Sequence, residues 1–266
     1  MTAIVVAESV TDLREVSGKV LVAGSHGGII AAYLGAKAGA HALILNDAGV
    51  GRDDAGIAGL AWLDKVAMAA AAVDYRSARI GNGADMLRRG IISHANRNAS
   101  RVGVAPGQSC AEAAARLRTA SPRPLRLPAI NEGRYRLYQV PPEVWALDSV
   151  GKLLREDQGR ILLIGSHGAL HGGRRDSALA VAARAVVFND AGVGMDRIGI
   201  SRLPVLEKRG IPAATVDFMS ARIGDGRSKW ETGVLSHTNA AARGERARAG
   251  ETVRAFVARL LRRKTG

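Results

Sequence analysis

The sequence contains very little cysteine and few aromatic residues. Its 266 residues include a single cysteine, Cys110, and only 4% Phe, Trp and Tyr. One cysteine excludes an internal disulfide, and the lack of a Cys-x-x-Cys pair excludes zinc or dithiol sites of that type. Because 47% of the residues are hydrophobic, the chain can still bury a sizeable core, built mainly from Ala, Val, Leu and Ile, as one large domain or two ordinary ones.

Long apolar runs are also missing. No run approaches the ~20 residues that a membrane-spanning helix needs. The beginning of the chain, Met1-Thr2-Ala3-Ile4, has neither the charged start nor the cleavage site of a secretion signal. We therefore expect a soluble, cytoplasmic protein without a membrane partner.

Negative charge is scarce, and the formal net charge is +14. Such a charge can indicate nucleic-acid binding. However, 31 of the 38 basic residues are arginines spread along the whole chain, and no aromatic residues are interleaved with them to stack bases. Nucleic-acid binding therefore stays a third hypothesis that rests on charge alone.

What the sequence does contain is a set of four motifs that each occur twice. They are Gly24-Ser25-His26-Gly27 with Gly165-Ser166-His167-Gly168, Asn46-Asp47-Ala48-Gly49-Val50-Gly51 with Asn189-Asp190-Ala191-Gly192-Val193-Gly194, Ser77-Ala78-Arg79-Ile80-Gly81 with Ser220-Ala221-Arg222-Ile223-Gly224, and Ser93-His94-x-Asn96 with Ser236-His237-x-Asn239. The first pair is 141 residues apart and the others 143, which indicates a small insertion after His167. The pattern predicts a tandem duplication. Because polar residues are retained while the apolar segments differ, we expect the motifs to form a functional site.

Each copy alternates apolar runs typical of buried strands with segments of helical periodicity, which predicts an α/β fold with mainly parallel sheets. We expect a first three-layer unit over residues 1–120, a Pro-rich linker over 121–132, a second unit over 133–266, and a pseudo-twofold relation between the units. Residues 135–140 are predicted to be the strand equivalent to residues 4–7, residues 178–184 a helix equivalent to 31–39, and Ser109 with Glu112 a helix-capping box.

The carboxyl ends of parallel strands usually open onto the ligand-binding crevice, and three of the four motifs follow such strands. We predict catalytic acid–base roles for six residues: His26, Asp47, His94, His167, Asp190 and His237. We predict substrate-binding roles for twelve more: Ser25, Gly27, Asn46, Asp74, Ser77, Arg79, Ser166, Gly168, Asn189, Asp217, Ser220 and Arg222. In this set the glycine motifs would cradle an anion and the arginines would grip a carboxylate.

Alternative roles stay open for the same residues. Asn, Asp, Ser and Gly are ordinary turn and cap residues, and the two arginines could form salt bridges between the copies. His26, Asp47, Asp74 and His94 could hold a divalent metal, although no tight ligand spacing is present. A serine nucleophile would need its base from another motif, for example Ser25 with His94, because adjacent Ser and His side chains seldom pair productively. The Gly motif lacks the lysine and spacing of nucleotide-binding loops, so we expect no nucleotide cofactor.

The leading functional hypothesis is an enzyme that acts on a small anionic or amide-bearing molecule by His/Asp acid–base chemistry, most plausibly hydrolysis. The alternative is a non-catalytic small-ligand binding or regulatory protein with two related pockets. The sequence leaves open whether the copies form one composite site or two, and whether the chain forms a homo-oligomer.

Overall fold

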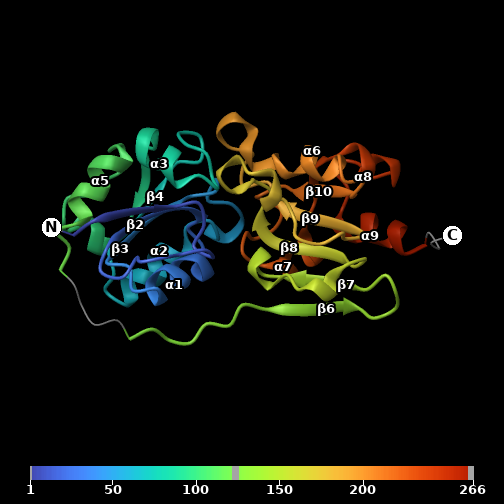
Figure 1. The fold of residues 1–266 in the computed structure, drawn as a ribbon, viewed down its shortest axis with the longest axis horizontal. Helices are drawn as coiled ribbons and strands as arrows, with labels where there is room; N and C mark the ends of the chain where they lie inside the picture. Colours follow the sequence, from blue (N-terminus) through green and yellow to red (C-terminus); the bar gives the residue numbers. More distant parts are fainter. Residues whose placement is uncertain (1, 122–125, 263–266) are drawn as a thin grey trace.

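The most apolar segments of the chain form the central strands of two sheets. The computed structural model, which describes residues 2–121 and 126–262, contains two α/β units side by side (Figure 1). The first sheet has the order β1-β2-β3-β4-β5 and the second β11-β10-β9-β8-β7-β6. The strands of the first sheet are β1 (Ile4–Ala7), β2 (Val20–His26), β3 (Ala42–Asn46), β4 (Ala70–Val73) and β5 (Ile92–Ala95). Those of the second are β6 (Arg134–Tyr138), β7 (Val144–Leu147), β8 (Ile161–His167), β9 (Ala185–Asn189), β10 (Ala213–Val216) and β11 (Leu235–Thr238).

The two sheets share one pairing pattern. In the first sheet, strands β1 to β4 run parallel to one another and β5 is antiparallel to β4. In the second sheet, strands β7 to β10 run parallel to one another and β11 is antiparallel to β10. The register is also repeated, because His26 pairs with Asn46 and His167 with Asn189. The predicted α/β fold with mainly parallel sheets is therefore confirmed, while a duplication as its origin remains an interpretation of the sequence.

Helices cover both faces of each sheet, which creates the three layers. In the first unit, one apolar core lies under α1 and α2 and another under α3 and α5. The predicted capping box begins α5, where Ser109 accepts from the Glu112 backbone and Glu112 accepts from that of Ser109. The helices are α1 (Ile29–Lys37), α2 (Ala58–Lys65), α3 (Gly83–Arg89), α4 (Arg97–Ser100), α5 (Cys110–Leu117), α6 (Arg202–Glu207), α7 (Gly226–Thr232), α8 (Ala240–Gly244) and α9 (Val253–Arg262).

Two expectations for the second unit are wrong. The strand equivalent to β1 is β7, because β7 runs parallel to β8 as β1 does to β2. The predicted strand over residues 135–140 corresponds to β6, an additional edge strand antiparallel to β7. The predicted helix over residues 178–184 is absent. In its place lie two three-residue 3₁₀ turns, His171–Gly173 and Arg175–Ser177, followed by irregular chain.

Two arginine side chains, of which Arg202 is buried and Arg209 is exposed, explain why this stretch needs no helix. The fully buried Arg202 donates from Nε to the Ala169 carbonyl at 2.9 Å and from Nη1 to the Ala178 carbonyl at 2.6 Å. Arg209 donates to the carbonyls of Leu179 and Val181. These side chains supply the hydrogen bonds that a helix would have made within itself. Gly59 occupies the position of Arg202 in the first unit, where α1 is present.

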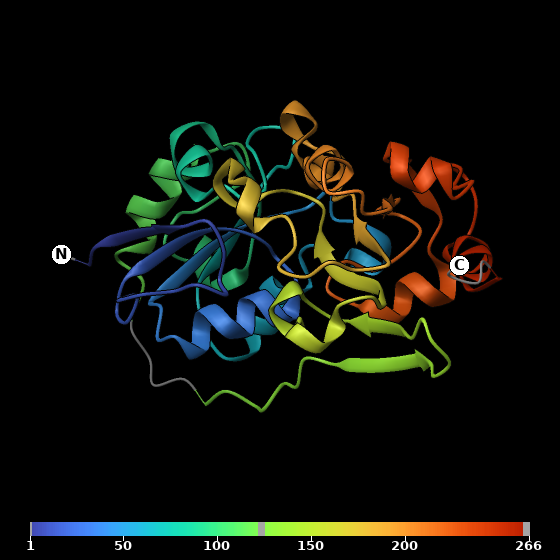
Figure 2. The same cartoon turned by 45° about the vertical axis from the view of Figure 1, so that its right-hand side comes forward.

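The predicted linker lies between the units, and residues 122–125 of it are outside the described part. Residues 126–133 run along the outside of the molecule and lead into β6 (Figures 1 and 2). The described helices include none long and apolar enough to cross a membrane.

The units meet through reciprocal contacts at the carboxyl ends of their strands. The Arg52 backbone N–H donates to the Phe218 carbonyl, and the Met195 N–H donates to the Tyr75 carbonyl, both at 2.9 Å. Arg79 pairs with Asp196 at 2.6 Å. Arg222 pairs with Asp53 at 2.7 Å. Contacts that recur with the partners exchanged are the mark of a twofold relation.

The Asn-Asp-Ala-Gly-Val-Gly loops form the centre of this interface. Val50 and Val193 both adopt φ of 65°, a left-handed conformation that is strained for a β-branched residue. A Cβ on Gly49 would lie 3.0 Å from the Phe218 ring and 3.5 Å from Cα of Gly192. Gly49, with φ of 77°, therefore leaves room for the Phe218 ring of the other unit and adopts a backbone conformation that favours glycine.

Candidate functional site

The retained histidines His26 and His167 lie at the ends of the equivalent strands β2 and β8 and face the interface between the units. His26 Nδ1 accepts the Gly28 N–H at 3.1 Å, and His167 Nδ1 accepts the Ala169 N–H at 3.3 Å. Burial lowers the pKa of both, that of His26 to about 4 with a further contribution from the charge of Lys229. A neutral imidazole whose Nδ1 accepts must carry its proton on Nε2. Each ring therefore presents an N–H donor from Nε2, and the predicted acid–base role of these histidines stays a prediction.

The retained aspartates Asp47 and Asp190 fasten neighbouring loops together. Asp47 Oδ1 accepts from the N–H groups of Gly49 and Tyr75, and Asp190 Oδ1 from those of Gly192 and Phe218. Burial raises the pKa of both carboxyl groups, that of Asp190 to about 6. Among the described residues, neither aspartate hydrogen-bonds to His26 or His167. The structure therefore does not assemble the predicted His–Asp pairs.

The remaining residues of the first two motifs are engaged within the fold. The N–H groups of Gly27 and Gly168 donate to the Asn46 and Asn189 carbonyls, so they do not point at a ligand. The side-chain Oδ1 atoms of these two asparagines accept from Ala48 and Ala191. The hydroxyl groups of Ser25 and Ser166 accept from the N–H groups of Val10 and Val150.

The Ser-Ala-Arg motifs have equivalent structural contacts. Ser77 donates to the Asp74 carbonyl and Ser220 to the Asp217 carbonyl, each at 2.8 Å. The Asp74 carboxylate binds Arg76, whose guanidinium lowers the carboxyl pKa against the effect of burial. The Asp217 carboxylate accepts from the Met219 N–H. Arg79 and Arg222 form the inter-unit salt bridges described above, so their predicted substrate contact stays a prediction.

The second Ser-His pair behaves differently from expectation. His94 Nδ1 bonds to the adjacent Ser93 hydroxyl at 3.0 Å, so neighbouring Ser and His side chains do pair here. The expected Ser25–His94 pair is not formed, because β2 and β5 are separated by β3 and β4. The predicted metal set is not brought together either: within residues 2–121 and 126–262, no group of three or more His, Cys, Asp or Glu side chains is placed to hold a metal ion.

A cleft of about 430 Å³ opens between the units beside His26. His26 and Asp148 also line a smaller inner cavity of about 30 Å³, which His167 and His171 border from the other side. The linker supplies Asn131 to the outer cleft. Ligand-binding sites of small molecules have volumes of this order and commonly lie between domains.

Two carboxyl groups of the second unit line the cleft. Asp148 follows β7 and accepts from Gly133 at 2.6 Å and from Gly226 at 3.1 Å. Burial raises its pKa in spite of these hydrogen bonds. Asp225 caps α7, where Oδ1 accepts from the Ser228 N–H at 3.0 Å. With Asp53, which is paired with Arg222, three acids of the described chain line the cleft. Asp148, with its raised pKa, is the one best suited to exchange a proton.

Arg227 lines the cleft beside these acids, and Lys229 is buried in the same helix, α7. Arg222 also lines the cleft, paired with Asp53. Arg227 lies over the Tyr135 ring, with Cζ 4.0 Å from the centroid, and it has no ion pair among the described residues. Lys229 is fully buried, and within the described part of the chain its Nζ donates only to the Gly165 carbonyl, at 3.4 Å. Burial lowers the pKa of Lys229 to about 7, while Asp225, Asp148 and Asp190 act in the opposite direction. A buried ammonium group so weakly hydrogen-bonded lowers stability, and groups with such perturbed pKa values are enriched near functional sites.

The equivalent position on the other side of the interface is closed. There the Gly172 N–H donates to the Gly81 carbonyl at 2.7 Å, and a Cβ on Gly81 would lie 2.6 Å from the Leu170 carbonyl oxygen. The irregular segment 169–177 thus covers the surface equivalent to the cleft. On the open side, Gly224 faces the His26 ring instead, since a Cβ there would lie 3.2 Å from Cε1.

Sequence reasoning missed Asp148, Arg227 and Lys229, because it followed residues that the copies share. At these positions the first unit has Glu8, Ala84 and Met86. One sequence signal could have identified Asp148. The residues Glu8-Ser9-Val10, directly after β1, correspond to Asp148-Ser149-Val150, directly after β7. The misassignment of residues 135–140 as the counterpart of residues 4–7 concealed it.

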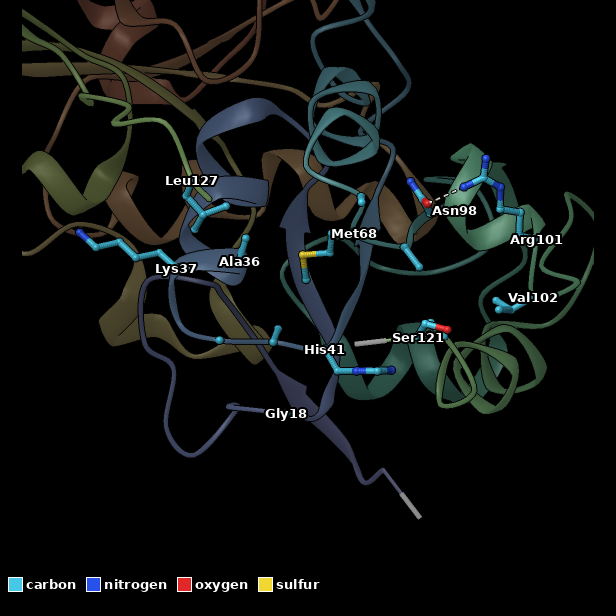
Figure 3. Close-up of a pocket in the computed structure, with 15 residues that line it drawn as sticks. Gly18, Ala36, Lys37, His41, Met68, Asn98, Arg101, Val102, Ser121 and Leu127 are labelled. Atoms are coloured by element: carbon cyan, nitrogen blue, oxygen red, sulfur yellow. Dashed lines mark hydrogen bonds between the residues drawn. The ribbon is translucent and has the colours of Figure 1, made fainter. Parts of the chain in front are cut away.

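Another hollow, of about 470 Å³, lies at the amino ends of the first sheet (Figure 3). His41 borders it, and its buried Nε2 has no hydrogen-bond partner. In the second unit Arg184 takes the position of His41 and donates to Glu245 at 3.1 Å. The charged side chains around the hollow do not converge: Lys37 extends away from the other labelled residues, and Arg101 turns to Asn98 (Figure 3). We therefore place the candidate site in the inter-unit cleft.

Comparisons of the chain with protein-family models, with curated proteins and with solved structures gave no match.

Proposed function

We propose that the inter-unit cleft is the single active site of an enzyme that hydrolyses a small anionic molecule bearing an amide or related C–N bond. The observation that carries this proposal is the asymmetry of the two sides. Asp225 and Arg227 line the cleft and Lys229 is buried in the same helix, α7, whereas the closed side has Asn82, Ala84 and Met86 at these positions. Three ionisable groups thus stand on the open side at positions where the closed side has none.

The proposed chemistry assigns roles to Asp148, His26 and Arg227. The Asp148 carboxylate takes a proton from water, and the resulting hydroxide attacks the carbonyl carbon. The His26 Nε2–H donates to the carbonyl oxygen as negative charge develops there, a role that suits a neutral histidine. Protonated Asp148 then returns its proton to the leaving nitrogen as the C–N bond breaks. Arg227 binds the carboxylate of the substrate, because it has no competing ion pair.

A substrate screen with three variants tests this assignment. Purified protein is incubated with a panel of small N-acyl amino acids, cyclic imides and carboxylated amides, and product formation is followed by mass spectrometry. For the active compound, Asp148→Asn should reduce kcat by about 10²-fold or more, and His26→Gln by a similar factor. Arg227→Ala should mainly raise KM.

The first unit provides matched controls for these variants. Glu8→Gln removes the counterpart of Asp148 on the closed side and should leave kcat unchanged. Asp225→Asn introduces the residue that already caps α3 as Asn82, so it should fold and still lower activity. Saturable binding of panel compounds without turnover would reject the enzyme and favour the ligand-binding alternative. Equal losses of kcat in Asp148→Asn and Glu8→Gln would contradict the proposal that the inter-unit cleft is the single active site.

A further inference from the structure

A separate concave surface lies in the second unit, where η6 (Met195–Ile200), α6, β11 and the start of α8 meet. It encloses about 460 Å³ and shares no lining residue with the inter-unit cleft. Arg197, His237 and Arg243 are among its lining residues. We call it the η6–β11 groove. Its volume is within the range of small-ligand sites.

The cations of the groove are not neutralised by neighbouring side chains. Within the described residues, Arg197 has no ion pair, and Arg243 donates only to the Thr238 carbonyl, at 2.6 Å. The groove also contains two carboxylates. Asp196 is already bound by Arg79 and Arg89. Glu207 accepts from the Ala240 N–H at 2.6 Å. Glu207 keeps its negative charge, because a backbone N–H does not neutralise a carboxylate, but it is outnumbered by two guanidinium groups that can bind an anion.

His237 has lost the partner that its counterpart keeps. In the first unit, His94 Nδ1 is bonded to Ser93, but in the second the Ser236 hydroxyl bonds to Thr215 at 3.0 Å. Ala72 stands at the position of Thr215 in the first unit and offers no such bond. His237 Nδ1 is consequently buried without a hydrogen-bond partner among the residues that the structure describes. The imidazole borders the groove beside Arg197 and is not held by a hydrogen bond of its own.

Comparison of the units shows that the charge of this groove is particular to the second one. Asp54 and Ser100 occupy the positions of Arg197 and Arg243 in the first unit. The equivalent surface there has an acid and a hydroxyl in place of two guanidinium groups. The histidine is thus common to both units, whereas its cationic neighbours are found in only one of them.

We propose that the η6–β11 groove is a second binding site, for the carboxylate or phosphate group of a small molecule. Arg197 and Arg243 would bind the oxygen atoms with charge-assisted hydrogen bonds, and His237 would donate one more. Planar guanidinium groups match both kinds of oxyanion. This proposal does not depend on the proposed activity of the inter-unit cleft, because the two sites have no residue in common.

Titration with two probe anions tests the proposal. The imidazole Cε1–H signal of His237 is followed by NMR while inorganic phosphate or succinate is added at constant ionic strength. We expect a saturable shift of this signal with at least one probe. Saturation by phosphate alone identifies a phosphate site, and saturation by both identifies a general oxyanion site. A shift that grows linearly with either probe, or no shift, would overturn the proposal.

Variants that introduce residues of the first unit distinguish binding in the groove from a general effect of the protein's charge. Arg197→Asp and Arg243→Ser introduce the residues found there, and each should weaken binding at least tenfold. Arg14→Asp makes the same charge change on the exposed surface of the first unit and should bind as the parent does. Circular dichroism establishes that the variants are folded, and His237→Gln, read by calorimetry, provides a second test. Unchanged affinity in folded Arg197→Asp and Arg243→Ser would also overturn the proposal.

Discussion

At the scale of residues, the shared and the differing positions have largely separate roles, with His26 as a shared residue that lines the cleft. The shared Asp47 and Asp190 fasten loops, and the shared glycines permit close backbone approach at the interface. The candidate chemical groups Asp225, Arg227 and Lys229 lie where the units differ. Polar residues that both units share, such as Asp47 and Asp190, therefore shape the interface between the units. Asp225 and Arg227, which differ between the units, line the open cleft.

We expect the buried ammonium group of Lys229 to lower the stability of the folded protein. Its pKa of about 7 in the folded chain, against 10.5 ordinarily, corresponds to a destabilisation of about 4 kcal/mol at pH 7. The unfolded chain binds more protons between pH 7 and 10.5, so this penalty shrinks as the pH rises. We expect Lys229→Met, the residue of the first unit, to be more stable than the parent at pH 7.

Thermal and denaturant unfolding of Lys229→Met at pH 7 and pH 10 measures this effect. The stability difference from the parent should be larger at pH 7. The exposed Lys208→Met serves as the control and should change stability little at either pH. A Lys229→Met protein that is less stable than the parent at pH 7 would show that the buried ammonium contributes favourably to the fold.

The titration of Asp190 should make the stability of the fold depend on pH in the opposite direction. The pKa of Asp190 is raised to about 6 in the folded chain, so between about pH 4 and 6 the folded form holds more protons than the unfolded one. The contribution of Asp190 to the unfolding free energy should fall by about 3 kcal/mol as the pH rises through this window. Asp190→Asn keeps an oxygen for Gly192 and Phe218 and removes the titration. Denaturant unfolding at pH 4, 5, 6 and 7 should give curves for parent and variant that diverge toward pH 6; parallel curves would contradict the assignment.

At the scale of elements, the segment over residues 169–183 depends on arginine side chains for its backbone hydrogen bonds. Arg202→Met leaves the carbonyls of Ala169 and Ala178 without their buried donor. We expect a loss of about 2–4 kcal/mol in unfolding free energy and faster amide hydrogen exchange over residues 169–183 than elsewhere. The exposed Arg175→Met should affect neither. Uniformly faster exchange in Arg202→Met would show that the segment does not open on its own.

The sequence allowed prediction of elements whose signal is local. Continuous apolar runs predicted β2, β3, β8 and β9, and the Ser109–Glu112 spacing predicted the start of α5. The irregular segment could not be predicted, because Ala178 and its neighbours have the composition of a helix and the donors that replace helical bonds come from Arg202 and Arg209. The cleft was missed for a related reason: its walls come from distant parts of the chain, including the linker.

At the scale of the whole molecule, the two units are joined by backbone contacts and glycine packing more than by their exposed ion pairs. Arg79 and Asp196 are 38% and 48% exposed, and ion pairs of this exposure contribute little. A double-mutant cycle with Arg79→Ala and Asp196→Ala, measured by denaturant unfolding, should give a coupling energy of about 0.2–1 kcal/mol. The reciprocal cycle with Arg222 and Asp53 should give a similar value. A coupling several times larger in either cycle would make the ion pairs principal links between the units.

The closure of one side by segment 169–177 has a consequence for how such a molecule can change. In a dimer of identical chains, every substitution appears at both symmetry-related positions, so opening one cleft opens the other and each new charge is introduced twice. In this chain the two sides are encoded separately, which is why Asp225 can stand opposite Asn82 and Lys229 opposite Met86. A destabilising group such as the buried lysine is then borne once per molecule, while the closed side is free to serve stability alone.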